Sequence, residues 1–316
     1  MRHWAIDAGG SSTTVLLDDG TKWKHESVNA ASVGTLEADR RLSELLRAIA
    51  QLGPTTGWLA TATVGGDAPH REVDRLTHIA EISGLAGTLV ISGDVLPLLL
   101  AAPLRNRGVA VVCGTGSGFL ASDGVSPPIS VGGCEYLGSD EGSAFALGLA
   151  GLRAAVRASD GRGPATALEL TLAENTHCTV RELARRLAAE PFPKAAVAAL
   201  AGAVCRCWLT GDAVASEIVA VAITDLLDGV RAARDAANLT TQWSATLNGG
   251  VFRGCPEFAE ALADKIVREL GADNPPSIID DPPKTVLAAL REHPRELPAV
   301  LADRWAWHRS MEGTAT

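Results

Sequence analysis

Two glycine-rich turns in this sequence have a composition that can bind an anion. One is Gly9-Gly10-Ser11-Ser12, and the other is Gly114-Thr115-Gly116-Ser117, which follows a β-branched run at 109–112. Successive backbone N–H groups in such a turn can point towards one negatively charged group. Either turn alone is equally consistent with a simple connection between two strands. The repetition of the pattern favours a binding role.

Three carboxylates accompany these turns. Asp7 precedes the first turn, Asp94 follows a short apolar run at 88–91, and Asp140 lies just ahead of an Ala/Leu-rich helical pattern. Negative charge stabilises the start of a helix, so capping is a sufficient explanation for Asp140 and, ahead of a helix beginning at Val95, for Asp94. A role at a binding site is the alternative, and an anchored capping carboxylate can also serve that role.

Composition limits the classes of protein that the chain can form. Its 316 residues, 47% of them hydrophobic and 21% charged, suffice for two domains. The net charge of -9 argues against nucleic-acid binding, which depends on clustered Lys and Arg. No apolar run approaches the ~20 residues of a membrane span, and no signal segment precedes the strand-like residues 3–8. We therefore expect a cytoplasmic protein without membrane contact.

The cysteines are consistent with that compartment. Six of them are scattered along the chain without a C-x-x-C pair. This spacing fits reduced thiols better than a disulfide framework or a zinc site.

Apolar periodicity predicts an α/β domain over residues 1–105. Three antiparallel strands at 3–8, 13–18 and 21–28 are followed by a helix at 35–52, a strand at 58–64, a helix at 72–82, a strand at 88–91 and a short helix that admits Pro97 in its first turn.

The same pattern starts again in residues 106–316. Strands are predicted at 109–112, 118–122 and 129–131, helices at 143–158, 164–172, 180–189, 194–209 and 213–237, and then a strand at 241–247, a helix at 256–270, a strand at 277–279 and helices at 284–291 and 301–308. The second copy thus carries a helical insertion at about 151–238, and the whole chain is a duplicated architecture.

Five motifs in fixed order resemble one family. IDAGGSSTT, SGDV, VCGTGSG, GGCEYLGSDEGSA and LNGGVF are similar to motifs of the actin-like ATPase superfamily, which holds sugar kinases, hsp70 and actin. The most similar branch is that of the N-acetylglucosamine kinases, grouped with the activator ATPases of benzoyl-CoA reductase and 2-hydroxyglutaryl-CoA dehydratase. The resemblance implies a two-domain, duplicated α/β fold of the ribonuclease H-like type. It also implies an ATP-dependent kinase that phosphorylates a hydroxyl group of an amino sugar or related cyclitol.

The resemblance assigns roles to individual residues. Asp7 would hold Mg²⁺ through water, and Asp94 would be the general base that accepts the proton of the sugar hydroxyl. ATP would be bound by Gly9, Gly10, Ser11, Ser12, Gly114, Thr115, Gly116, Asn248, Gly249 and Gly250. The sugar would contact Asn29, Asp94, Ser117, Gly132, Gly133 and Asp140.

The sequence departs from the family at two places. Gly132-Gly133-Cys134-Glu135 replaces a Gly-Gly-Trp-Gly run, and Lys284-Thr285 replaces a Gly-Ala pair beside adenine, which implies a narrower or shifted adenine pocket. A Glu135 side chain facing the substrate would favour a free ammonium group, as in glucosamine or an aminocyclitol, over N-acetylglucosamine. The alternative is that Glu135 faces solvent and Tyr136 or Cys134 lines the site.

Two other functions and the assembly stay open. An ATPase activator would need an iron–sulfur cluster on cysteines; Cys113 and Cys134 lie nearest the motifs, but neither belongs to a cluster-binding run. A sugar sensor without turnover is disfavoured by the intact carboxylates. The apolar helix at 213–237 either forms a homodimer face or packs inside a core.

Overall fold

The computed structural model describes residues 2–10, 12–65, 69–293 and 297–313. The chain divides into two compact units. The first contains Met1–Ala110, Leu120–Ile129 and Ile279–Thr316, and the second contains Val111–Phe119 and Ser130–Ile278. Residues from 279 onwards thus belong to the first unit, whereas the sequence-based division at residue 105 stays a prediction.

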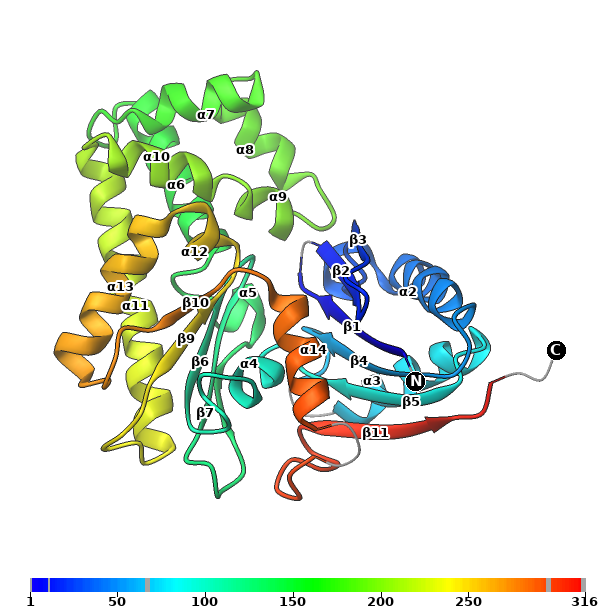
Figure 1. The fold of residues 1–316 in the computed structure, drawn as a ribbon. Helices are drawn as coiled ribbons and strands as arrows, with labels where there is room; N and C mark the ends of the chain where they lie inside the picture. The colour runs from blue at the N-terminus through cyan, green and yellow to red at the C-terminus, as the bar shows by residue number, and fades with distance from the viewer. Residues whose placement is uncertain (1, 11, 66–68, 294–296, 314–316) are drawn as a thin grey trace. The chain divides into compact units, whose positions relative to one another are not determined.

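A six-stranded sheet forms the centre of the first unit, with the order β11-β5-β4-β1-β2-β3 (Figure 1). Its strands are β1 Arg2–Ala8, β2 Ser12–Leu17, β3 Lys22–Glu26, β4 Thr55–Thr61, β5 Gly87–Ser92 and β11 Ala306–Met311. The first three pair antiparallel, which confirms the predicted meander, while β4 is parallel to both β1 and β5.

Helices cover both faces of this sheet. They are α1 Ala30–Val33, α2 Thr35–Ala50, α3 Pro69–Ile82, α4 Leu96–Leu100 and α14 Pro282–Glu292. One hydrophobic core joins Trp4 and Ile6 of β1 to Leu46 of α2 and Ile79 of α3. Because side chains alternate along a strand, Asp7 faces the other side of the sheet, where α14 packs on β1, β2 and β4.

The prediction of a helix at 301–308 is wrong. Residues 306–311 form β11, which pairs antiparallel with β5 and places Trp307 opposite Ile91. The side chain of Trp307 is buried in the core beside Met311. Ala and Trp are compatible with a helix in isolation, so the free edge of β5 decides the conformation.

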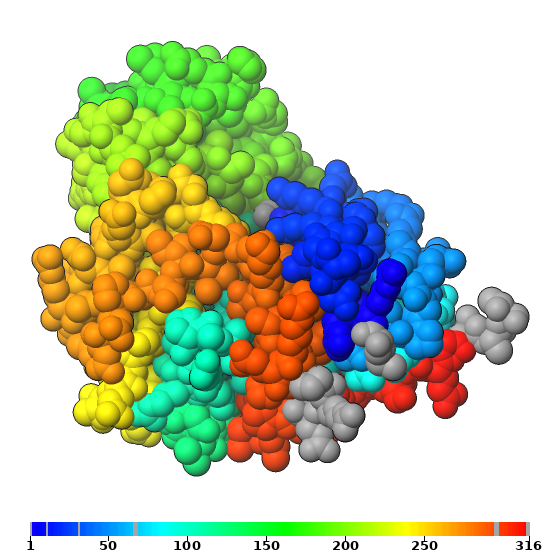
Figure 2. Space-filling view, viewed as in Figure 1, coloured from blue at the N-terminus to red at the C-terminus, as the bar shows by residue number. Residues whose placement is uncertain are grey.

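The second sheet has the order β10-β9-β6-β7-β8. Its strands are β6 Gly108–Cys113, β7 Ser117–Ser122, β8 Ile129–Gly132, β9 Ala245–Asn248 and β10 Ser277–Ile279. The helices of this part are α5 Glu135–Gly138, α6 Ala144–Ser159, α7 Leu168–Thr176, α8 Val180–Ala188, α9 Lys194–Ala198, α10 Ala201–Leu209, α11 Ala213–Ala236, α12 Gly250–Gly254 and α13 Pro256–Leu270. In Figure 2 the green part of the chain, which contains α7 to α10, forms one continuous surface of the second unit.

Several element boundaries differ from those predicted. The single helix predicted at 194–209 is two helices, because Leu200 N–H bonds to Val197 O and this tighter three-residue spacing interrupts the α-helical pattern. Strand β4 begins three residues earlier than predicted, and α7 begins four residues later. No helix in the described part of the chain is long and apolar enough to cross a membrane.

Candidate active site

The first glycine turn joins β1 to β2. Gly9 N–H donates to Ser12 O at 3.1 Å and closes the turn. Gly9, Gly10 and Ser12 are all half-buried, whereas Ser11, the remaining predicted residue of the turn, lies outside the described residues. The Gly9 N–H is thus used within the turn and is not a donor for a ligand.

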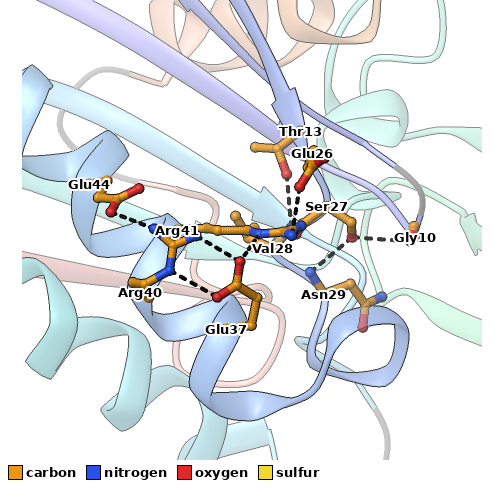
Figure 3. A network of polar contacts seen from close by, with 10 residues as sticks. All are labelled: Gly10, Thr13, Glu26, Ser27, Val28, Asn29, Glu37, Arg40, Arg41 and Glu44. Atoms are coloured by element: carbon orange, nitrogen blue, oxygen red, sulfur yellow. Dashed lines mark hydrogen bonds and ion pairs between the residues drawn. The ribbon is translucent and has the colours of Figure 1, made fainter. Parts of the chain in front are cut away.

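Two serine hydroxyls hold the carbonyl groups of this turn, and Figure 3 shows one of them, that of Ser27, with its bond to Gly10. Ser27 Oγ donates towards Gly9 O at 3.3 Å and Gly10 O at 3.1 Å, and Ser32 Oγ donates to Gly10 O at 2.5 Å. The C=O and N–H groups of a trans peptide point in opposite directions. The N–H of Gly10 shares its peptide with the carbonyl of Gly9 and therefore points away from Ser27.

The same network fixes Asn29. Its backbone N–H donates to Ser27 Oγ at 3.0 Å, and its side chain is 6% exposed. Arg41 donates to Ser27 O at 3.0 Å and pairs with Glu37 and Glu26, as Figure 3 shows. The residue predicted to contact a sugar is thus tied to the residue that holds the first glycine turn.

Asp7 and Asp94 lie at the same edge of the first sheet. Asp7 is in register with Ala60 of β4, and Ala60 is in register with Ser92 of β5. These three strands are parallel, so their carboxyl ends meet at one edge, which is where open α/β sheets bind ligands. Asp94 follows Ser92 by two residues. Asp7 and Asp94 are both half-buried.

Burial perturbs Asp94. Loss of solvation raises the pKa of its carboxyl to about 6, although the backbone N–H groups of Asp94 and Val95 act in the opposite direction. Asp94 forms no ion pair with any residue in the described ranges. Val95, not Asp94, occupies the N-cap position of α4, and no side chain caps that helix. The capping explanation of Asp94 is therefore wrong.

The second glycine turn rests on the N-terminus of α6. Gly114 N–H donates to Gly116 O at 2.9 Å within the turn. The carbonyls of Gly114 and Thr115 accept from Ala144 N–H at 2.9 Å and Phe145 N–H at 3.2 Å. Because the C=O and N–H bonds of one trans peptide point in opposite directions, the N–H groups of Thr115 and Gly116, which share peptides with these carbonyls, point away from α6. Two adjacent donors are thus aimed in one direction, as an anion site requires.

Asp140 anchors this turn. Its Oδ1 accepts from Ser117 N–H at 2.9 Å, and the residue is only 4% exposed. A Cβ on Gly116 would lie 2.5 Å from Asp140 Oδ1, so glycine is needed there. The N-cap of α6 is Ser143, whose side chain accepts from Ala146 N–H. Capping therefore does not explain Asp140, and that interpretation is wrong.

Two further glycine pairs lie beside the second turn. Gly249 has a φ of 135°, and a Cβ there would lie 2.0 Å from Cys113 O, just ahead of the turn. A Cβ on Gly114 would lie 3.8 Å from Gly250 N. Gly133 likewise lies against Gly118 of β7, since a Cβ on Gly118 would lie 3.8 Å from Gly133 Cα. The side chain of Asn248 accepts from Arg253 at 3.0 Å.

Lys194 contacts two residues of this candidate site, and the sequence analysis did not identify it. Its Nζ lies 2.8 Å from Asp140 Oδ2 and 2.5 Å from Glu135 Oε2, and its side chain is 14% exposed. Burial alone lowers the pKa of Lys194, but the hydrogen bonds and charges of Asp140 and Glu135 outweigh it and raise the pKa. The available signal was a single lysine, one of five in the chain, in an Ala-rich helical stretch.

Glu135 forms an ion pair with another residue of the same chain. Its side chain is 56% exposed and bonds to Lys194, and its φ of 61° is in the left-handed region. Neither of the two expected orientations of Glu135 included this partner. Tyr136 packs its ring against Phe145 at 5.0 Å, and Cys134 is exposed.

The predicted residues form two groups, one in each unit. The first unit brings together Asp7, Gly9, Gly10, Ser12, Asn29 and Asp94 at one sheet edge and its turns. The second brings together Gly114, Thr115, Gly116, Ser117, Gly132, Gly133, Glu135, Asp140, Asn248, Gly249 and Gly250. Lys284 lies on α14 of the first unit and pairs with Asp281 at 3.3 Å.

The two sheets and their order of elements define an actin-like ATPase fold, as predicted. A protein assigned as an N-acetylglucosamine kinase from Porphyromonas gingivalis has a similar structure, with a TM-score of 0.70 and 19% identity over 92% of this chain and 99% of that one. A second such protein, from Chromobacterium violaceum, has a TM-score of 0.65 and 23% identity over 92% and 98% of the two chains.

Family membership follows from the sequence match. The model of the BadF/BadG/BcrA/BcrD ATPase family matches residues 5–280, so this chain belongs to that family. It is also 25% identical over 260 residues to an N-acetylmuramic acid/N-acetylglucosamine kinase of Clostridium acetobutylicum, a match that covers 78% of this chain and 84% of the relative.

Proposed function

We propose that this protein is an ATP-dependent sugar kinase that transfers the γ-phosphoryl group to a hydroxyl of an amino sugar, either glucosamine or N-acetylglucosamine, or of a related cyclitol. Phosphoryl transfer needs aligned donors, charge stabilisation and an acceptor for one proton rather than a protein nucleophile. Family membership and the kinase relatives support the reaction class. The choice of an amino sugar as the acceptor is more specific than this reaction class and is part of the proposal.

The two glycine turns supply donors for phosphate. In the second turn the N–H groups of Thr115 and Gly116 share one direction, because α6 holds the carbonyls of Gly114 and Thr115. In the first turn Gly10 N–H is oriented by the hydroxyl of Ser27. Such fixed N–H groups stabilise developing negative charge without reorganising during the reaction. The turn at Asn248, Gly249 and Gly250 would contact the nucleoside.

Asp7 fits a magnesium ion that is shared with ATP. Mg²⁺ prefers oxygen ligands and is usually bound by one or two carboxylates, with water and phosphate completing its shell. Asp7 offers one half-buried carboxylate next to Gly9 and Gly10. When bound, the ion would neutralise charge on the phosphates, and the role of Asp7 would be to orient its water ligands.

The perturbed carboxyl of Asp94 is the observation that carries the proposal. A general base works best when its pKa is close to the working pH. Burial without a cationic partner in the described structure raises the pKa of Asp94 to about 6, so the group is mostly ionised at neutral pH yet basic enough to accept a hydroxyl proton. Asn29, Ser117, Gly132, Gly133 and Asp140 are the proposed sugar contacts.

An ATPase activator is the second candidate, favoured by one observation. Cys134 is exposed next to the paired glycines, as a ligand shared between two subunits would have to be. Burial raises the pKa of the Cys113 thiol far above its usual range, so Cys113 is a poor partner for it.

An ADP-release screen tests the proposed function. Purified protein is given ATP and Mg²⁺ with glucosamine, N-acetylglucosamine, glucose or an aminocyclitol. We expect ADP release that depends on one or more amino sugars or cyclitols. ADP release of equal rate with every sugar and without any sugar would contradict the kinase and favour the activator, which iron analysis of the same preparation would check.

A further inference from the structure

Lys194 places an ammonium group between the two carboxylates of Asp140 and Glu135. The distances of 2.8 Å and 2.5 Å are those of direct ion pairs. The ring of Tyr136 lies below the same ammonium, 5.8 Å from its centroid. All four residues belong to the second unit, so the arrangement does not depend on how the units are placed.

This cluster adjoins the turn proposed to hold phosphate. Asp140 Oδ1 accepts from Ser117 N–H, and a Cβ on Gly116 would lie 2.5 Å from the same oxygen. In phosphoryl transfer the acceptor oxygen must come within about 3–3.5 Å of the phosphorus. If the phosphates contact the N–H groups of Thr115 and Gly116, the acceptor molecule must lie close to Asp140 and Lys194.

The ammonium of Lys194 competes with any ammonium of the acceptor. An internal group is always present at a high effective concentration, whereas a substrate must come from solution. The 14% exposure of Lys194 limits its screening by water, and its raised pKa keeps it charged. One of the two negative charges that could recognise a protonated amine is therefore already neutralised, and the Lys194 ammonium lies against both carboxylates.

We propose that Lys194 sets the charge selectivity of the acceptor site, so that the acceptor carries a neutral, acylated amino group rather than a protonated one. This inference rests on the proposed kinase function and narrows its substrate class. It reverses the sequence-based expectation for Glu135, which favoured a free ammonium group, because Lys194 occupies the position that such a group would take.

The test compares N-acetylglucosamine with glucosamine as acceptors at about pH 7, where an ordinary amino group of this kind is mostly protonated. The kcat/KM ratio of the two sugars is measured for the wild type and for Lys194→Met. We expect the wild type to favour the acetylated sugar. Lys194→Met should shift the ratio at least about tenfold towards glucosamine, since the freed carboxylates can bind its ammonium group.

Three further variants sharpen the test. Adding Glu135→Gln to Lys194→Met should move the ratio back towards the acetylated sugar. Lys265→Met is the matched control. Lys265 also forms an ion pair, with Glu269 at 2.8 Å on the surface of α13, and the kcat/KM ratio of this variant should equal that of the wild type.

Lys194→Met leaves a buried Asp140 without its cation and could fail to fold. Lys194→Met with Asp140→Asn removes both charges and should still shift the ratio severalfold towards glucosamine.

Each outcome bears on a defined claim. A folded, active Lys194→Met enzyme with the wild-type ratio overturns the selectivity proposal and leaves the kinase function intact. A wild-type enzyme that prefers glucosamine also overturns the selectivity proposal and leaves the kinase function intact. A wild type that phosphorylates neither sugar overturns the proposed function on these acceptors, and the selectivity proposal with it.

Discussion

The two glycine turns of this protein are similar in sequence but are held by different groups. In the first, side-chain hydroxyls of Ser27 and Ser32 hold the carbonyls of Gly9 and Gly10. In the second, backbone N–H groups at the start of α6 do so, and Asp140 binds the next residue, Ser117. Turn geometry can therefore be supplied by side chains or by a helix terminus, with the same result that N–H groups point outwards.

The carboxylates near the two turns differ more deeply. Asp140 is paired with Lys194, whereas Asp94 has no ion pair within the described residues and has a raised pKa. A carboxylate that is held by a cation and by a backbone N–H is fixed in position. A carboxylate that burial makes more basic can accept a proton near neutral pH. The contrast agrees with the proposal that Asp94 accepts the proton and that Asp140 positions its neighbours.

The largest effect is expected for Asp94→Asn. Removing a general base should lower kcat by ~10²-fold or more, with little change in ATP affinity. Steady-state kinetics with ATP titration checks this. Turnover near that of the wild type in a folded Asp94→Asn protein would remove the catalytic role of Asp94.

A smaller effect is expected from a methyl group on the second turn. Gly116→Ala places a Cβ 2.5 Å from the pinned Asp140 carboxylate, whereas among the described residues a Cβ on Gly9 of the first turn would contact Ser12 O at 3.7 Å, an ordinary distance. Overpacking of this kind costs ~1–3 kcal/mol, so Gly116→Ala should weaken ATP binding about tenfold. Gly9→Ala is the comparison variant in the other turn; because the Gly9 N–H already bonds to Ser12 O, it should bind ATP nearly as well as the wild type. Equal losses in both variants would mean that Asp140 does not shape the turn.

Stability should respond to pH through Asp94. The pKa of its carboxyl is about 6 in the folded protein, above its ordinary 3.8. The protonated group therefore favours folding below pH ~4, and that contribution is lost as the pH rises through about 6. Asp94→Asn stays neutral and should gain ~2 kcal/mol over the wild type at pH 7, with little difference at pH ~4. Chemical unfolding at both pH values measures it; a difference that does not depend on pH would contradict the raised pKa.

The smallest effect is expected for Ser27→Ala. The hydroxyl of Ser27 contacts the carbonyls of Gly9 and Gly10 and accepts from Asn29 N–H, and the residue is 4% exposed. Its loss should lower the free energy of unfolding by ~1–2 kcal/mol, since buried partners stay unsatisfied. Ser126→Ala is the control: Ser126 bonds to Asp123 at 2.8 Å but is exposed, so a change below ~0.5 kcal/mol is expected. Equal costs would show that the first turn does not depend on Ser27.

The elements that sequence analysis predicted well are those with local causes. The hairpins at 9–12 and 114–117 follow from glycine in tight turns, and the amphipathic helix at 35–50 follows from its apolar spacing. The meander and the strands before Asp94 were predicted for the same reason. The residues of the two turns could therefore be predicted from their local sequence alone.

The features that sequence analysis missed depend on distant partners. Lys194 lies 59 residues from Glu135, and no local pattern pairs a lysine in an Ala-rich helix with a carboxylate so far away. The strand β11 forms because β5 offers an edge. Capping seemed sufficient for Asp94 and Asp140, because a carboxylate ahead of a helix has the same local pattern whether it caps the helix or binds something else.

Identification of the phosphorylated product tests the central claim most directly. Phosphorus NMR or mass spectrometry of a reaction with ATP, Mg²⁺ and the preferred amino sugar should show one sugar phosphate for each ADP formed, and Asp94→Asn should form both products more slowly to the same extent. Formation of ADP with inorganic phosphate and no sugar phosphate would contradict the account, because it would mean that water and not a sugar hydroxyl accepts the phosphoryl group.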